Sequence, residues 1–157
     1  MQAQENYQAP DDTGAADDSI LDRLSSLYAM EASAFRSYEK ALASPYLKRF
    51  RLALRAIRDS HEERMNVLAD RLRLSGGELP QSMKIRESLL ALLEDAALAL
   101  GTPSTAFSAF DRGEAHILKE YQKALDTLSA ENRDWVQREL LSRHIGAHAV
   151  MNALKEN

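Results

Sequence analysis

The sequence contains no cysteine, and this absence excludes several kinds of site. Without thiols the chain can form no disulfide, no thiolate metal site and no cysteine nucleophile. Any bound metal would have to be held by oxygen and nitrogen ligands, which suit ions such as iron, manganese and zinc.

Long hydrophobic runs are also missing, so the sequence predicts no membrane-spanning segment. Residues 1–18 have neither a basic start nor an apolar stretch, so we expect no secretory signal and a cytoplasmic location. This stretch carries Glu5, Asp11, Asp12 and Asp17, with very few large apolar residues. Because it can bury little surface, we expect residues 1–18 to form a disordered acidic tail.

An excess of positive charge is lacking as well. The chain has 20 basic and 24 acidic residues and a net charge of −4, which argues against a nucleic-acid-binding protein. Its 157 residues, 45% hydrophobic and 28% charged, fit one soluble globular domain. We expect this domain to occupy residues 19–157.

What the sequence does contain is helical periodicity. Apolar residues recur every three or four positions, and the alternation typical of strands appears nowhere. We predict helices from Ser19 to the Ser44–Pro45 break, from there to Gly76–Gly77, over 82–100, from Pro103 towards Ser129, and from Ser129 onward. The predicted fold is therefore all-α, with the helix over 82–100 crossing between two helical hairpins.

The two predicted hairpins are copies of one another. Each half carries a glutamate, a tyrosine and a histidine at a constant spacing of 83 residues: Glu31, Tyr38 and His61, then Glu114, Tyr121 and His144. In both halves the glutamate and histidine lie on the apolar stripe, so we expect them to face inward.

The repeated glutamates and histidines are also matched in height. Glu31 and His61 are equally far from the first turn, and Glu114 and His144 are equally far from the second. Antiparallel neighbours therefore place all four side chains in one layer, as helix bundles do when they build metal sites. We predict these four residues as the metal ligands, with His148 as a possible further ligand and Fe, Mn or Zn as the ion.

Duplicated glutamate-bearing hairpins joined by a long crossover resemble the ferritin-like superfamily, which includes ferritins and rubrerythrins. Residues 19–155 are more closely similar to an uncharacterised bacterial ferritin-related family, a domain of unknown function. The similarity lies in the Leu-Ser-Gly-Gly end of the second helix, the extra crossover helix and the Gly-Glu-Ala…Tyr-Gln-Lys-Ala-Leu helix. It implies a ferritin-like four-helix bundle and, if the site is active, metal-dependent redox chemistry such as iron oxidation.

The sequence departs from the ferritin-like di-iron pattern at the bridging carboxylates. That pattern takes a single Glu from each of two helices and Glu-x-x-His from each of the other two. Arg58 and Leu141 stand three residues before His61 and His144, and Ile145 stands three before His148. We therefore expect a degenerate site, mononuclear or lost, and we do not favour an enzymatic activity.

A metal-free layer is the competing interpretation of the same residues. Paired glutamates and histidines can satisfy one another and fix the register of the helices without any ion. Arg58 and Arg64 each lie one turn from His61, so either can neutralise the glutamates and repel a cation. A bound metal and no metal at all are both open at this point.

Two further functions remain as alternatives. Ala115-His116-Ile117-Leu118-Lys119 is similar to the His-x-Leu-Lys-Gly motif of histidine phosphotransfer domains, but Glu120 replaces the glycine. The other alternative is a structural or interaction scaffold, or a stress-associated bundle, without chemistry. In that case the basic run over 49–58 and the acidic tail can mediate self-association as a homo-oligomer.

Overall fold

The computed structural model describes residues 13–80, 95, 97–99 and 101–156. Regular structure in this described part is entirely helical, which confirms the all-α prediction. None of its helices is long and apolar enough to cross a membrane.

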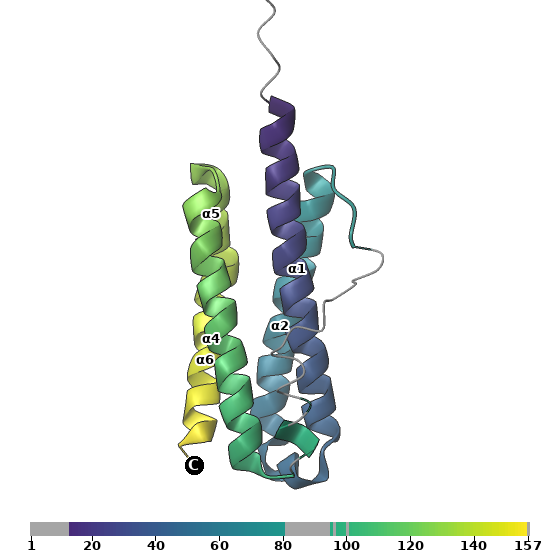
Figure 1. Cartoon of the computed structure of the whole chain (residues 1–157), viewed down its shortest axis with the longest axis vertical. Helices are drawn as coiled ribbons and strands as arrows, with labels where there is room; N and C mark the ends of the chain where they lie inside the picture. Colours follow the sequence, from purple (N-terminus) through teal and green to yellow (C-terminus); the bar gives the residue numbers. More distant parts are fainter. Residues whose placement is uncertain (1–12, 81–94, 96, 100, 157) are drawn as a thin grey trace, which may run out of the picture.

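The described helices form two hairpins that lie side by side (Figure 1). The first consists of α1 (Thr13–Ala43), the 3-10 helix η1 (Pro45–Phe50) and α2 (Arg51–Leu74). The second consists of α4 (Pro103–Thr127), α5 (Ala130–Val136), the π-helix η2 (Gln137–Leu141) and α6 (Ser142–Lys155). Between the hairpins, α2 packs against α6 and α1 packs against α4.

Several predicted helix boundaries are confirmed, and others differ from the prediction. Ser129 and Thr102 cap their helices, each accepting a hydrogen bond from the backbone N–H three residues on. The first helix ends just before Ser44, as predicted, but the Ser44 side chain makes no capping hydrogen bond to the next helix. The first helix begins at Thr13 and not at Ser19, so it includes residues 13–18, which the sequence assigned to the tail.

The remaining tail residues and most of the predicted crossover helix lie outside the described residues. Of the crossover, residues 95 and 97–99 are helical. They are attached to the first hairpin by polar contacts and by packing. Lys40 Nζ binds the Asp95 carboxylate at 2.8 Å, the Tyr46 hydroxyl donates to the Leu98 carbonyl at 2.7 Å, and Leu98 packs against the apolar core.

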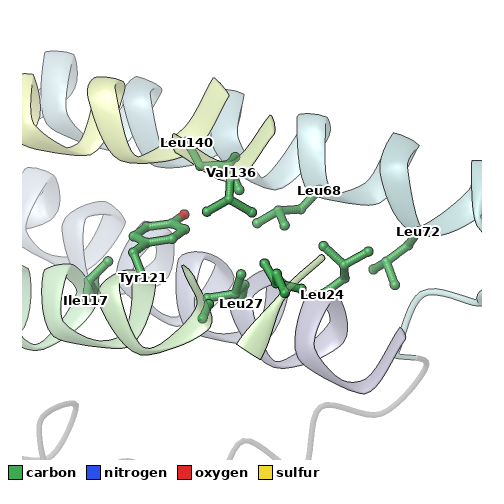
Figure 2. Packing of buried hydrophobic residues seen from close by; sticks show 10 residues of the cluster. Leu24, Leu27, Leu68, Leu72, Ile117, Tyr121, Val136 and Leu140 are labelled. Carbon is green, nitrogen blue, oxygen red and sulfur yellow. The ribbon is translucent and has the colours of Figure 1, made fainter. Parts of the chain in front are cut away.

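Two apolar clusters fill the interior. One gathers Leu24 and Leu27 of α1 with Leu68 and Leu72 of α2 and reaches Tyr121 of α4, as Figure 2 shows. The other lies towards the turn between α1 and α2, and its buried members are Tyr38, Ala41, Leu47, Leu54, Ile57, Ala106, Phe107, Phe110, Ala147 and Met151. One predicted site residue falls between the members of the two clusters on each of α1, α2 and α4, and also along the continuous run of α5, η2 and α6. A buried polar layer therefore divides the hydrophobic core.

Candidate functional site: a buried layer of charged side chains

The four residues predicted from the repeat do converge in this polar layer. Glu31 comes from α1, His61 from α2, Glu114 from α4 and His144 from α6, and their exposures are 0%, 0%, 1% and 0%. Within the first hairpin, Glu31 Oε2 lies 2.6 Å from His61 Nδ1. Within the second, Glu114 Oε2 lies 3.5 Å from His144 Nδ1. The predicted match in height is confirmed for both pairs.

His61 joins the two halves of the molecule. Its Nε2 atom lies 3.0 Å from Glu114 Oε1, while its Nδ1 atom faces Glu31. Burial alone would lower the pKa of His61, but the charges of Glu114 and Glu31 outweigh it and raise the pKa to about 9. The ring is therefore an imidazolium at neutral pH, and it donates one hydrogen bond to each carboxylate.

Arg64 lies in the same layer, one turn beyond His61. Its Nε donates to Glu31 Oε1 at 2.9 Å and its Nη1 donates to Ser60 Oγ at 2.7 Å, with 0% of the side chain exposed. Its Nη2 lies 2.8 Å from His61 Nδ1. With Nδ1 protonated, these two atoms are both donors and form no hydrogen bond with each other. The Glu31 carboxylate accepts from both cations, through Oε1 from Arg64 and through Oε2 from His61.

The other arginine that the sequence offered does not enter the layer. Arg58 binds Glu39 at 2.6 Å, and its side chain keeps 23% of its surface exposed. Of the two neutralising arginines, Arg64 is thus the one that meets a site glutamate.

The repeated tyrosines cross from one half to the other. Tyr38 donates its hydroxyl to Glu114 Oε1 at 2.6 Å, and Tyr121 donates its hydroxyl to Glu31 Oε1. Each tyrosine therefore serves the glutamate of the opposite repeat, as a pseudo-twofold arrangement requires. The sequence placed these tyrosines at matching positions of the two repeats but gave them no specific partner.

Both carboxylates are ionised. Burial alone would raise the pKa of Glu31, but Arg64 and His61 outweigh it and hold the pKa at about 2. Burial acts in the same direction on Glu114, where His61 outweighs it and lowers the pKa. Two anions thus face two cations, His61 and Arg64, and the layer is electrically neutral without an ion.

The second half lacks an equivalent of Arg64. The residue at the matching repeat position, 83 residues later, is Ala147. Glu114 Oε2 and His144 Nδ1 are buried without any hydrogen-bond partner in the described part of the chain. His144 Nε2 donates to the Glu114 backbone carbonyl at 3.0 Å, and burial lowers the pKa of the ring. A neutral His144 therefore presents a bare Nδ1 acceptor to a carboxylate oxygen.

His148 does not join the layer. Its ring stacks at 6.1 Å from the His144 ring, and its Nε2 lies 3.3 Å from Asp111 Oδ1. Asp111 also accepts a 2.6 Å hydrogen bond from Lys155, and its carboxylate is 19% exposed. The predicted extra ligand is thus engaged in a polar cluster at the edge of the molecule.

The residues present do not fit a di-iron centre. Arg58 and Leu141 take the places of the bridging carboxylates, and Glu31 is already bound to Arg64 and His61. Among the residues that the structure describes, no three His, Asp or Glu side chains form a metal-binding group. The only oxygen and nitrogen atoms of the layer that lack partners within the described part are Glu114 Oε2 and His144 Nδ1.

His116 lies on the opposite face of α4. It is exposed, as a phosphate-accepting histidine would have to be. The pKa of the Glu120 carboxyl is lowered mainly by a hydrogen bond from Lys123, with a smaller electrostatic contribution from His116. Phosphotransfer therefore stays a prediction, with a carboxylate beside the proposed acceptor.

Comparison with known proteins gives no identity. No protein-family model, no curated protein and no solved structure matches this chain. A function has to be argued from the geometry of the polar layer and the surface.

Proposed function

We propose that this chain is a ferritin-like bundle of two duplicated hairpins in which an arginine has replaced the metal, and that it acts as a non-enzymatic interaction scaffold. The contact between Arg64 Nε and Glu31 Oε1, 2.9 Å long and fully buried, carries the proposal. A guanidinium in this place supplies the positive charge that a metal supplies to a carboxylate layer.

Charge balance supports a metal-free layer. Glu31 and Glu114 are matched by His61 and Arg64, so a divalent ion would add two positive charges to a neutral and buried site. Binding would require the loss of a buried ion pair, which is costly. Burial also disfavours catalysis on a large organic substrate, because such a molecule cannot reach side chains that are 0–1% exposed.

A second candidate function is the binding of a single cation in the second half. The observation that favours it is the pair of partnerless acceptors, Glu114 Oε2 and His144 Nδ1, 3.5 Å apart. Oxygen and nitrogen ligands of this kind suit Fe(II), Mn(II) or Zn(II). Two ligands make a weaker site than the four expected from the sequence.

Metal analysis of protein purified without chelators, and again after reconstitution with Fe(II), Mn(II) and Zn(II), tests the proposal. We expect less than about a tenth of an equivalent in the wild type, because binding would compete with a buried arginine. Removal of that arginine by Arg64→Ala frees the Glu31 carboxylate and should raise the retained metal several-fold. The matched control, Arg58→Ala, should leave the metal content unchanged.

About one equivalent of metal in the wild type would overturn the scaffold proposal in favour of the cation site. In that case Glu114→Gln and His144→Gln should each abolish uptake. Far-UV circular dichroism establishes for each variant that the helices are retained, so that a change in metal content is not read from unfolded chain.

A further inference from the structure

The turn of the first hairpin carries an exposed basic patch. Four cationic side chains in η1 and the first turns of α2 are exposed: Lys48, Arg49, Arg51 and Arg55. The ion pairs within the described part of the chain involve none of them. The guanidinium of Arg49 covers the Phe50 ring at 4.4 Å, which leaves its charge at the surface.

A leucine lies in the middle of this patch. Leu52 is 85% exposed, the largest value among the large hydrophobic residues of the described part. Arg55 is one helical turn further along α2, so Leu52 and Arg55 are neighbours on one face, and Arg51 directly precedes Leu52. An apolar contact point surrounded by cations fits an acidic partner with an apolar or aromatic residue.

The chain itself contains a segment of that chemistry. Residues 1–12 include Glu5, Asp11 and Asp12 and no basic residue, and Tyr7 lies among them. The first cation of the sequence is Arg23. Charge complementarity therefore points to this segment as the occupant of the basic patch.

Within one molecule Asp11 and Asp12 cannot reach the patch. The Glu31–His61 contact sets the register of the first hairpin, so Arg55, six residues before His61, lies level with Ser37, six residues after Glu31. Thr13 is 24 helical residues from Ser37, or ~36 Å at 1.5 Å per residue. Glu5 precedes Thr13 by eight residues and spans at most ~29 Å when fully extended, so only the tip of the Arg55 side chain comes within its reach, and Asp11 and Asp12 span far less.

We propose that two copies of this chain associate antiparallel, the acidic segment 1–12 of each binding the basic patch of the other. An antiparallel twofold brings the start of one α1 beside the turn of its partner, and the same contact then forms twice. Figure 1 shows these two ends at opposite ends of the molecule. This proposal rests on the scaffold function proposed above. The partner of the scaffold is a second copy of the same chain.

A charge-exchange experiment on the full chain tests the proposal. One variant reverses the patch (Arg51→Glu with Arg55→Glu), and another reverses the acidic segment (Asp11→Lys with Asp12→Lys). Sedimentation velocity should show a wild-type dimer that weakens as ionic strength rises from about 0.1 M to about 1 M, because the Debye length falls from about 10 Å to about 3 Å. Each variant alone should be monomeric, since like charges then face one another.

The decisive sample is an equimolar mixture of the two variants. In a mixed pair both contacts join opposite charges again, so the dimer should return to at least half of its wild-type fraction. Arg112→Glu with Lys119→Glu, which places the same charge change on exposed cations of α4 in the second hairpin, is the matched control and should leave the wild-type dimer intact.

Three results would overturn the proposal: a monomeric wild type at low salt, single-sided variants that still dimerise, or a mixture that stays monomeric. Co-sedimentation of a monomeric wild type with phosphatidylserine vesicles would assign the patch to a membrane surface instead. The patch variants leave the buried layer untouched, so their metal content stays that of the wild type. A failed dimer test and a failed metal-free site are therefore told apart.

Discussion

The contribution of Arg64 to the stability of the fold depends on its ion pair with Glu31. Burial alone would lower the pKa of Arg64, but Glu31 outweighs it and raises the pKa, so the guanidinium stays charged in the core. A buried ion pair adds little compared with an apolar pair of the same shape, whereas removal of one partner leaves an uncompensated charge.

The first prediction follows from this asymmetry. Arg64→Met removes the cation while filling much of its volume, and it should lower the free energy of unfolding by about 3–5 kcal/mol, because Glu31 is left unpaired. Urea denaturation measures the change. Arg58→Met is the control and should cost less than about 1 kcal/mol, since its ion pair with Glu39 is partly exposed.

A double variant distinguishes the loss of the Arg64–Glu31 ion pair from the loss of the volume of the Arg64 side chain. Arg64→Met combined with Glu31→Gln removes both charges, so it should recover a large part of the loss caused by Arg64→Met alone. A double variant that is fully as unstable as the sum of the single changes would show that Arg64 acts through packing and not through its charge.

His61 makes the stability depend on pH on the alkaline side. Its pKa is about 9 in the folded chain against 6.5 for a free histidine, so its contribution is complete below pH 6.5 and is lost as pH rises through 9. The free energy of unfolding should fall by an amount on the order of 3 kcal/mol across this window. Urea titrations at a series of pH values measure it.

His61→Gln provides the reference for this pH dependence. The variant should be less stable at pH 7 but nearly flat between pH 7 and pH 9, because no imidazolium remains to lose its proton. An equally steep decline in His61→Gln would assign the titration to a different group.

The repeat made the two glutamates and the two histidines of the polar layer predictable, but it did not predict Arg64. Glu31, His61, Glu114 and His144 share spacing, stripe and height, and these properties are visible in the sequence. Arg58 and Arg64 lie three residues to either side of His61, which places them ~60° to either side of it on the helix. Periodicity cannot choose between them; Glu39 on the neighbouring helix binds Arg58 and leaves Arg64 to the core.

At the scale of the helix, two glycines should respond in opposite ways to the same substitution. Gly76 follows the end of α2 with φ at +78°, a conformation that strains a residue with a side chain. Gly146 lies in α6, exposed, and a Cβ added there meets nothing within 4 Å.

Gly76→Ala should therefore lower the free energy of unfolding by about 1 kcal/mol, through left-handed strain. Gly146→Ala should raise it by about 0.5–1 kcal/mol, through helix propensity. Thermal unfolding of both variants against the wild type measures the two signs. Destabilisation by Gly146→Ala would mean that the outer face of α6 is covered in solution.

Helix ends and irregular turns were the least predictable elements. The apolar pattern begins at Ile20, whereas α1 begins at Thr13, because alanine favours helix without adding to an apolar stripe. The π-turn Gln137–Leu141 precedes His144 and has no counterpart in α2. Its wider hydrogen-bond spacing depends on tertiary packing, and no residue type in that stretch indicates it.

Across the whole molecule, the residues that recur at the 83-residue spacing are arranged symmetrically, but the charges around them are not symmetric. The two tyrosines exchange glutamates between the halves, yet Arg64 exists in only one of them. The first half is satisfied by its own arginine, and the second retains two partnerless acceptors in the described part of the chain. The sequence predicted the symmetric arrangement of the glutamates and histidines. The position of the Arg64 side chain determines how their charges are balanced.

Urea unfolding of EDTA-treated protein, with and without added Fe(II), Mn(II) or Zn(II), tests most directly whether Arg64 completes the buried layer in place of a metal. We predict a cooperative transition with the same midpoint in every sample, because an ion that does not bind the folded state cannot stabilise it. A metal that stabilised the EDTA-treated chain by about 2.7 kcal/mol, the value for a ligand at about 100 times its Kd, would contradict this. So would loss of the transition on EDTA treatment.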